Sequence, residues 1–310
     1  MNLNEKDSGI VIFDIKEQEE RIVSFYGDKE RIAYITSEFR SAETINGTVD
    51  EFINFSLHFA RNGNHLVSCE ILSCGIKKYP YNVELLSCFL NCAIDSGDSN
   101  EIVKCEDIYT RLREIPLTRY SERAFYSILK YLAEKRTNVR PKEEFLVLQD
   151  AHEILDVFKR QYPESEGGYF AQCDFIVDNN AEEIKTILKK AVAKLSSCPK
   201  CALKLADILC AQGNYLEACH VIEKCLTSVQ TLSNVNKAYV YFLSGICEYG
   251  LLMNMDAGNE RNEEIKAKIK KIYTVFRISR SDYYNLHSVY KKEIERIIYV
   301  IEQQFGVAYS

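Results

Sequence analysis

Cys198 and Cys201, with Pro and Lys between them, have the spacing of a metal-binding or redox-active pair. Such a pair can supply half of a zinc site, or can cycle between a dithiol and a disulfide. A structural zinc site needs four ligands, and the next candidates, Cys210 and His220, fall in segments with the pattern of helix core. A redox pair would follow a β-strand, whereas the preceding run has a helical pattern. We expect a turn between helices here, and keep the two cysteines as weak metal candidates.

The remaining histidines and carboxylates form no catalytic group that can be recognised in the sequence. The five histidines are scattered, and the chain has no HExxH motif, no glycine-rich phosphate loop and no nucleophile elbow. Acidic residues are numerous, but their pattern is that of solvated helix faces. We therefore expect a protein that is not an enzyme and needs no cofactor.

Composition and charge exclude several classes of function. The 310 residues are 46% hydrophobic and 27% charged, which is typical of a folded chain. The formal net charge of −6 disfavours direct nucleic-acid binding, because neutralising phosphates requires a basic face. The longest apolar run, residues 239–253, is interrupted by Glu248 and two glycines, so no membrane span is predicted.

Twelve cysteines are distributed along the chain. The N-terminal segment lacks an apolar core of signal-peptide length, so we expect a cytoplasmic protein with reduced thiols. Most of the cysteines stand beside Leu, Ile or Ala in helical patterns, which favours a role as small buried packing residues.

The elements that would position these residues are short amphipathic helices. Residues 199–226 predict two helices joined by a turn at Gly213, since a helix often ends at a glycine with positive φ. Helices of about a dozen residues are marginal in water alone, so they must pack on neighbours. A shift of 34 residues brings an upstream pair into register, with Asn179 at the place of Gly213. Apolar or small residues then coincide at Phe175 and Leu209, Ile184 and Ala218, Leu188 and Ile222, Ala191 and Cys225, and Val192 and Leu226.

A helix–turn–helix unit with a period of 34 residues resembles the tetratricopeptide repeat (TPR) family. Phe52 and Phe59 on one helix, a turn at Gly63 and a closing Pro80 fit the same frame, although the chain contains no Trp. Further copies are predicted from Val83, over residues 117–163 as a stretched unit, and from Val235. The resemblance implies an all-α, right-handed α-solenoid of five to six helix-turn-helix repeats with helical caps.

Three regions are predicted along the chain. Residues 1–47 form an N-terminal tail with capping helices at 15–26 and 29–41, or a degenerate first repeat. Residues 48–278 form the repeat array, in which 135–142 is a polar connection between two helices. Residues 279–310 form a C-terminal cap, with a helix from Ser281 to Phe305.

In the family that this chain resembles, the first helix of each unit lines a concave surface, which implies a binding groove. Tyrosine is frequent on these helices, and its rigid ring with a hydrogen-bonding tip suits peptide recognition. Alternatively, about half of these tyrosines pack between repeats. The groove candidates by helical position are Asn91, Asp95, Arg123, Tyr131, Tyr169, Asp207, Tyr239 and Phe242.

We expect a non-catalytic protein–protein interaction scaffold or adaptor that binds a peptide or partner segment, as a subunit of a larger complex. Some relatives in the resembling family clamp acidic heat-shock tails with Lys and Asn, but here these places hold Ile53 and Leu57, so that ligand is not expected. The alternatives are a peptide-responsive regulator of a partner protein, and a metal or redox protein centred on Cys198 and Cys201.

Overall fold

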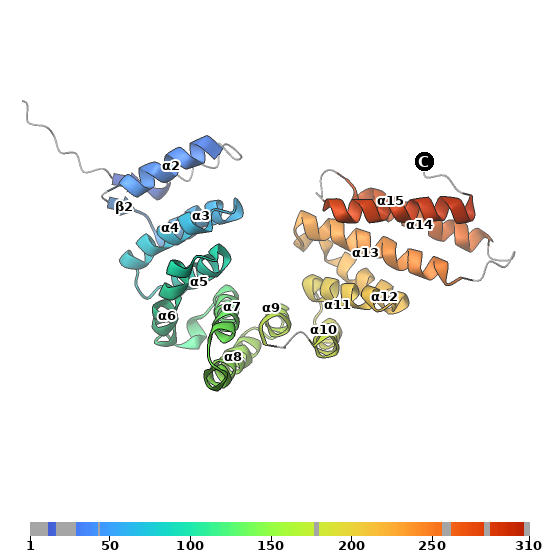
Figure 1. Ribbon diagram of the computed structural model, residues 1–310. Helices are drawn as coiled ribbons and strands as arrows, with labels where there is room; N and C mark the ends of the chain where they lie inside the picture. The colour runs from blue at the N-terminus through green and yellow to red at the C-terminus, as the bar shows by residue number, and fades with distance from the viewer. Residues whose placement is uncertain are drawn as a thin grey trace, which may run out of the picture. The chain divides into compact units, whose positions relative to one another are not determined.

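Two compact units make up the chain, Met1–Tyr162 and Pro163–Ser310, and each is described by itself. No shift in composition marks this boundary, which falls inside the predicted repeat array. The predicted helix at 15–26 and the predicted turn at Asn179 lie mostly or wholly outside the described residues. The computed structural model describes residues 12–16, 29–42, 44–176, 180–255, 262–281 and 286–306 (Figure 1).

Helices dominate both units, so the predicted all-α class is confirmed. Among the described residues, β-structure is limited to one parallel pair of three-residue strands, in which Ile12 lies opposite Thr44. The elements of unit 1 are β1 (Ile12–Asp14), α2 (Lys29–Ser41), β2 (Thr44–Asn46), α3 (Val49–Arg61), α4 (His65–Lys78), α5 (Val83–Ser96), α6 (Ser99–Arg113), η1 (Leu117–Arg119), α7 (Glu122–Asn138) and α8 (Pro141–Gln161). In this part of the chain α2 has the predicted bounds.

The start of α3 is set by a capping box. The Thr48 hydroxyl accepts a hydrogen bond from the backbone N–H of Glu51 at 3.3 Å, and the Glu51 carboxylate accepts one from the N–H of Thr48 at 2.7 Å. Each bond satisfies a donor that the first turn would otherwise leave without a partner. The helix then buries Phe52, Phe55 and Phe59 along one face. The capping residues and the apolar periodicity of the sequence therefore both predict this helix.

The α3–α4 hairpin in unit 1 and the α11–α12 hairpin in unit 2 share one turn geometry. Gly63 and Gly213 have φ values of 78° and 74°. In each turn the residue after the glycine donates its N–H back to the first helix, at 2.9 Å from Asn64 to the Phe59 carbonyl and at 2.9 Å from Asn214 to the Leu209 carbonyl. This pattern closes a helix with a left-handed residue, which glycine adopts without a Cβ penalty.

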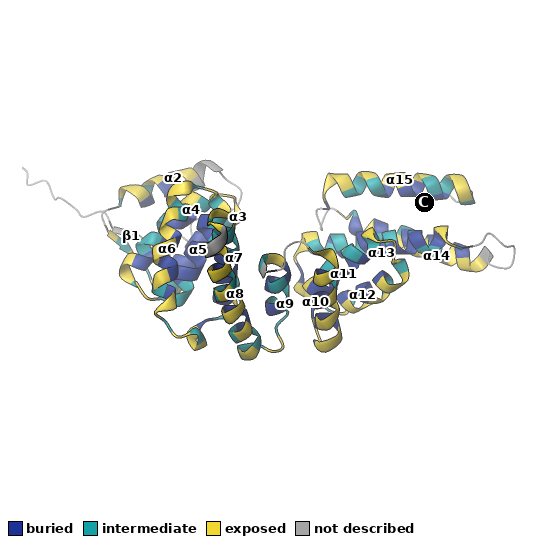
Figure 2. Ribbon diagram, turned by 60° about the horizontal axis from the view of Figure 1, so that its bottom comes forward, coloured by how far each residue is buried: buried dark blue, intermediate teal, exposed yellow. Residues whose placement is uncertain are grey.

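Within unit 1 the helices pack as successive hairpins. The first helices α3, α5 and α7 lie side by side, and α4 and α6 lie on the opposite side of them (Figure 1). The faces that meet are buried and the outward faces are exposed (Figure 2). The predicted polar connection at 135–142 is wrong, because α7 continues to Asn138 and α8 begins at Pro141. Proline fits the first turn of a helix, where its missing N–H costs nothing, so here it opens α8.

Unit 2 has one hydrophobic core that runs through its helices. Glycine permits close contact at two positions in this core: Gly245 lies against the Phe276 ring, and Gly250 lies against the Tyr215 ring. Nine of the twelve cysteines of the whole chain are buried, which agrees with a packing role for those nine. The elements of unit 2 are α9 (Gly167–Ala171), the π-helical η2 (Gln172–Ile176), α10 (Ala181–Lys194), α11 (Pro199–Ala211), α12 (Tyr215–Thr227), η3 (Val229–Thr231), α13 (Asn234–Met253), α14 (Asn262–Ser279) and α15 (Ser288–Phe305).

The last helix is shorter than predicted. It begins at Ser288, not at Ser281, and His287 caps it by accepting a hydrogen bond from the N–H of Val289 at 3.3 Å. Leu286, just before the cap, is 3% exposed and belongs to the core of unit 2. An apolar residue outside the helix had the same spacing as the helical stripe, which explains the error. None of the described helices has the length and apolar character that crossing a membrane requires.

Candidate functional site

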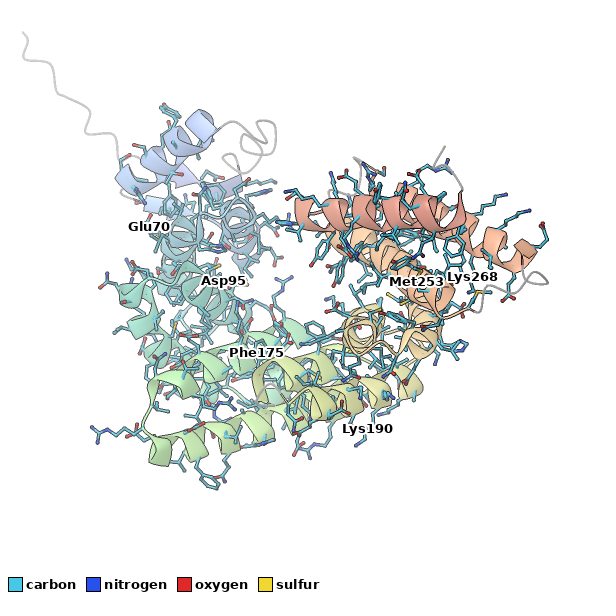
Figure 3. All side chains as sticks on the ribbon, turned by 45° about the vertical axis from the view of Figure 1, so that its right-hand side comes forward. Glu70, Asp95, Phe175, Lys190, Met253 and Lys268 are labelled. Atoms are coloured by element: carbon cyan, nitrogen blue, oxygen red, sulfur yellow. The ribbon has the colours of Figure 1, made fainter. Side chains whose placement is uncertain are left out.

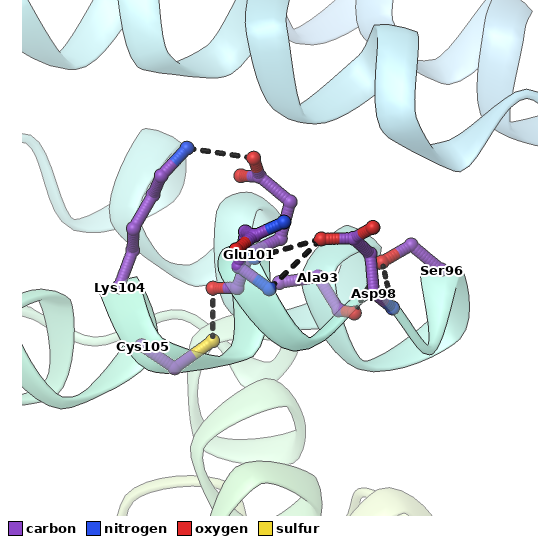
Figure 4. Close-up of polar contacts among 7 residues, drawn as sticks. Ala93, Ser96, Asp98, Glu101, Lys104 and Cys105 are labelled. Carbon is purple, nitrogen blue, oxygen red and sulfur yellow. Dashed lines mark hydrogen bonds and ion pairs between the residues drawn. The ribbon is translucent and has the colours of Figure 1, made fainter.

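Asp95 lies in the last turn of helix α5, and a short connection leads from there to α6 (Figure 3). Gly97 ends α5 with a φ of 64°. Asp98 then caps α6, and its carboxylate accepts hydrogen bonds from the N–H groups of Asn100 at 2.9 Å and Glu101 at 3.2 Å (Figure 4). These caps fix where α5 ends and α6 begins, and so they fix the position of Asp95 at the end of α5.

Asp95 faces a cation on the neighbouring helix α7. Its carboxylate accepts a hydrogen bond from the ammonium group of Lys130, so an ion pair joins α5 to α7 at their surface. Asn91 stands one helical turn before Asp95, and Arg123 stands two turns before Lys130, so each lies on the same side of its helix as the pair. We call this surface the α5–α7 seam; its residues are Cys88, Asn91 and Asp95 of α5 and Arg123, Ser127 and Lys130 of α7.

Two polar atoms of the seam are buried without a hydrogen-bond partner. They are Oδ1 of Asn91 and Oγ of Ser127, whose residue is fully buried. A buried polar atom without a partner costs about 1–3 kcal/mol, so these two atoms reduce the stability of the packing between α5 and α7. At the end of the seam, Arg123 is exposed and lies beside the Cys88 thiol, whose pKa is raised by burial and partly lowered again by Arg123.

Tyr131 does not belong to this surface, although the sequence proposed it as a groove residue. It is 5% exposed, and its hydroxyl donates to the Glu106 carboxylate at 2.7 Å. Its ring lies 5.3 Å from that of Tyr109, and Lys135 completes the group by an ion pair with Glu106 at 2.8 Å. Burial, followed by the hydrogen bond to Glu106, raises the pKa of Tyr131. Tyr131 therefore ties α6 to α7 and offers no contact area to a partner.

In unit 2, Asp207 and Tyr239 come together across α11 and α13. The Tyr239 hydroxyl donates to the exposed Asp207 carboxylate at 2.5 Å. The Tyr239 ring is half-buried, with centroids 5.8 Å from Phe242 and 5.0 Å from Tyr290 of α15. Burial and then the bond to Asp207 raise the pKa of Tyr239. Phe242 is 5% exposed, so this candidate is also a packing residue.

Tyr169, on the short helix α9, is half-buried and packs against the core of unit 2. The eight candidates thus fall into two groups on separate units. Asn91, Asp95 and Arg123 share the α5–α7 seam, whereas Asp207, Tyr239 and Tyr169 lie on unit 2. Because Tyr131 and Phe242 are buried, three candidates remain on each unit, and those of the seam lie on two adjacent helices.

Cys198 and Cys201 open α11 and are both buried. The helix start is capped by the Glu166 carboxylate, which accepts hydrogen bonds from the N–H groups of Lys200 at 2.9 Å and Cys201 at 3.0 Å. Burial raises the pKa of both thiols, whereas a metal-bound cysteine is a thiolate. Across the described ranges, no group of three or more His, Cys, Asp or Glu residues is arranged to hold a metal ion.

Lys130 and Ser127 of the seam were missed by the sequence analysis. Ser127 and Lys130 lie four and seven residues after Arg123, on the same side of α7, so helical spacing alone would have placed them there. What the spacing does not give is that Lys130 meets Asp95 of another helix. The sequence matches no protein-family model, and no curated protein is significantly similar to it.

Proposed function

We propose that this chain is a non-catalytic, cytoplasmic interaction scaffold that binds a peptide or partner segment, as a subunit of a larger complex. Its hairpins are TPR-like repeats of a right-handed α-solenoid. Support for the repeats comes from the shared turn geometry at Gly63 and Gly213 and from the 34-residue register between the hairpins of unit 2.

The observation that carries the binding proposal is the α5–α7 seam. Asp95 and Arg123 are exposed on it, Asn91 is partly exposed, and Asp95 forms an ion pair with Lys130 at the surface. An extended peptide presents backbone N–H and C=O groups at regular intervals, and the partly exposed Asn91 amide can form a hydrogen bond with one of them.

Charge sets the side-chain preference of the bound segment. Arg123 is exposed, and Lys130 holds a carboxylate already, so an acidic group on the partner can bind Arg123 or replace Asp95 at Lys130. An exposed ion pair is worth at most about 1 kcal/mol, so exchanging one carboxylate for another costs little. The seam is therefore suited to a segment with at least one acidic residue.

Affinity capture followed by quantitative mass spectrometry tests this function, with the wild-type chain and an Asp95→Lys variant compared in the same extract. The charge reversal places two cations together, and we expect partners that bind at the seam to change in amount by about tenfold or more. Asp156→Lys on the exposed side of α8 makes the same charge change in the same unit and serves as the control. Binding of the identified segment is then measured by calorimetry with Arg123→Glu. Equal binding to all variants would place the binding surface elsewhere.

A further inference from the structure

Three cysteines from three successive helices of unit 2 bring their sulfur atoms together. Cys210 comes from α11, Cys219 from α12 and Cys247 from α13. The Sγ atoms of Cys210 and Cys247 are 3.0 Å apart, although the two residues are 37 positions apart in the sequence. A disulfide needs its sulfurs about 2.05 Å apart, so a movement of about 1 Å would allow the bond. All three thiols are free.

The surroundings of Cys219 favour its thiolate. A hydrogen bond with the Cys247 thiol lowers the pKa of Cys219, and Lys271 and Lys268 act in the same direction, against burial and Glu248. The Glu248 carboxylate accepts hydrogen bonds from Lys271 at 2.6 Å and from Lys268 at 3.0 Å, which holds both cations near the thiol. The Cys219 thiol itself donates a long hydrogen bond to the Glu248 carboxylate, at 3.9 Å, which opposes its ionisation. By contrast, burial raises the pKa of Cys225 on the same helix to about 12.

Access differs among the three thiols in a way that suits an ordered reaction. Cys210 and Cys219 are partly exposed, whereas Cys247 is fully buried between them. A small oxidant can therefore reach the Cys219 thiolate, which is the reactive form of cysteine. The buried Cys247 is protected from direct oxidation but is already in hydrogen-bonding contact with both neighbours.

We propose that Cys210, Cys219 and Cys247 form a peroxide-reactive thiol site whose stable oxidised product is a Cys210–Cys247 disulfide. The site goes beyond the proposed scaffold function and does not depend on it. The oxidant is hydrogen peroxide.

The reaction has three steps. First, the Cys219 thiolate attacks a peroxide oxygen: the O–O bond breaks, Cys219 becomes a sulfenic acid and hydroxide leaves. Second, hydroxide takes the Cys247 proton and the Cys247 thiolate attacks the Cys219 sulfur, which forms a Cys219–Cys247 disulfide. The sulfenic hydroxyl leaves as hydroxide, which takes the Cys210 proton to give a second water molecule.

In the third step the Cys210 thiolate attacks the Cys247 sulfur. A Cys210–Cys247 disulfide forms and Cys219 leaves as a thiolate. A thiol of lower pKa is the better leaving group, so the exchange runs toward the product in which Cys219 is released. The new bond joins α11 to α13, the two helices that carry Asp207 and Tyr239.

Peroxide titration of the reduced full-length chain tests the site, with remaining thiols alkylated and the peptides mapped by mass spectrometry. We expect one intramolecular disulfide, between Cys210 and Cys247. Cys210→Ser stops the exchange and leaves a Cys219–Cys247 bond, and Cys219→Ser slows disulfide formation about tenfold or more. Cys74→Ser, at a partly exposed thiol of unit 1 whose pKa is raised by burial, is the matched control and leaves both rate and product unchanged.

Cys247→Ala should abolish the bond. If that buried substitution prevents folding, as judged by circular dichroism, the Cys210→Ser and Cys219→Ser variants at partly exposed positions still decide the question. Cross-links spread over the other cysteines, or equal oxidation rates in wild type and Cys219→Ser, would overturn the proposal. So would a metal ion that copurifies with the chain and protects these three thiols from the peroxide.

Discussion

Gly245 in the middle of α13 gives a sharp test of the packing in unit 2. A Cβ atom added there would lie 2.1 Å from Cε1, 2.5 Å from Cδ1 and 2.7 Å from Cζ of Phe276. The Phe276 ring is fully buried and stacks on Phe242, with centroids 6.4 Å apart. The ring therefore has no free space into which it can move away from the new methyl group.

The expected effect of Gly245→Ala follows from two opposing contributions. Replacing glycine by alanine inside a helix stabilises the helix by about 1 kcal/mol. Overpacking a rigid core costs about 1–3 kcal/mol and occasionally more. Because three ring atoms would be too close and the ring is held on its other side, we place the cost at about 3 kcal/mol or above. The net expectation is a loss of about 2 kcal/mol in the free energy of unfolding of unit 2.

Gly250→Ala is the matched control, since it makes the same change in the same helix. Its Cβ would lie 2.4 Å from two ring atoms of Tyr215. Tyr215 is only partly buried at the start of α12, so its ring can turn toward solvent. We expect a change of less than about 1 kcal/mol, because the gain in helix propensity offsets the displacement.

Urea denaturation followed by far-ultraviolet circular dichroism measures both variants. We expect a lower midpoint for Gly245→Ala, with an unchanged slope of the free energy against urea concentration, and a midpoint near that of wild type for Gly250→Ala. If Gly245→Ala is as stable as wild type, or if both variants lose the same stability, the close approach of α13 to Phe276 is not what requires glycine at 245.

Three further outcomes are expected. Thr48→Ala removes the capping box of α3 and should lower the stability of unit 1 by about 1 kcal/mol in urea, while Thr48→Ser should retain most of it. Burial raises the pKa of Glu248, but its two lysine partners outweigh this effect and hold the pKa below 4.5. The stability that the Glu248 carboxylate supplies is therefore present above pH 4.5 and lost as the pH falls, and Glu248→Gln should flatten that loss in thermal melts from pH 7 to 3. The Cys210–Cys247 disulfide closes a 37-residue separation and should stabilise unit 2 by up to about 4 kcal/mol, an increase that a reductant reverses.

Local signals in the sequence predicted the helices well. The start of α3 was predictable because Thr48 supplies a hydrogen-bond acceptor for the first turn of the helix. The turns of the two hairpins were predictable because a positive φ favours glycine, which stands at 63 and 213. The connection predicted at 135–142 was wrong because proline occurs both in loops and in the first turn of helices, and Pro141 stands in the first turn of α8. The division into two units after Tyr162 could not be predicted from the local sequence, because it depends on which helices pack against one another.

The candidate site was predictable only in part, because exposure depends on neighbours that spacing does not show. Asp95 and Arg123 are exposed, as helical spacing suggested, but the ion pair of Asp95 with Lys130 is a contact between helices. Tyr131 and Phe242 occupy equally suitable helical positions, yet other helices cover them. For Tyr131 the covering helix also supplies the Glu106 carboxylate that its buried hydroxyl needs.

The cysteines show why residue type alone does not separate packing from chemistry. Cys225 and Cys247 are both buried small residues in helices that pack closely, and an alanine stands 34 residues before Cys225. Their sulfur atoms nevertheless have different neighbours. The Cys225 thiol lies 3.3 Å from the Pro199 carbonyl, to which it donates, and so is satisfied within the backbone. The Cys247 thiol lies 3.0 Å from the Cys210 sulfur, and this contact between two sulfur atoms can become a covalent bond.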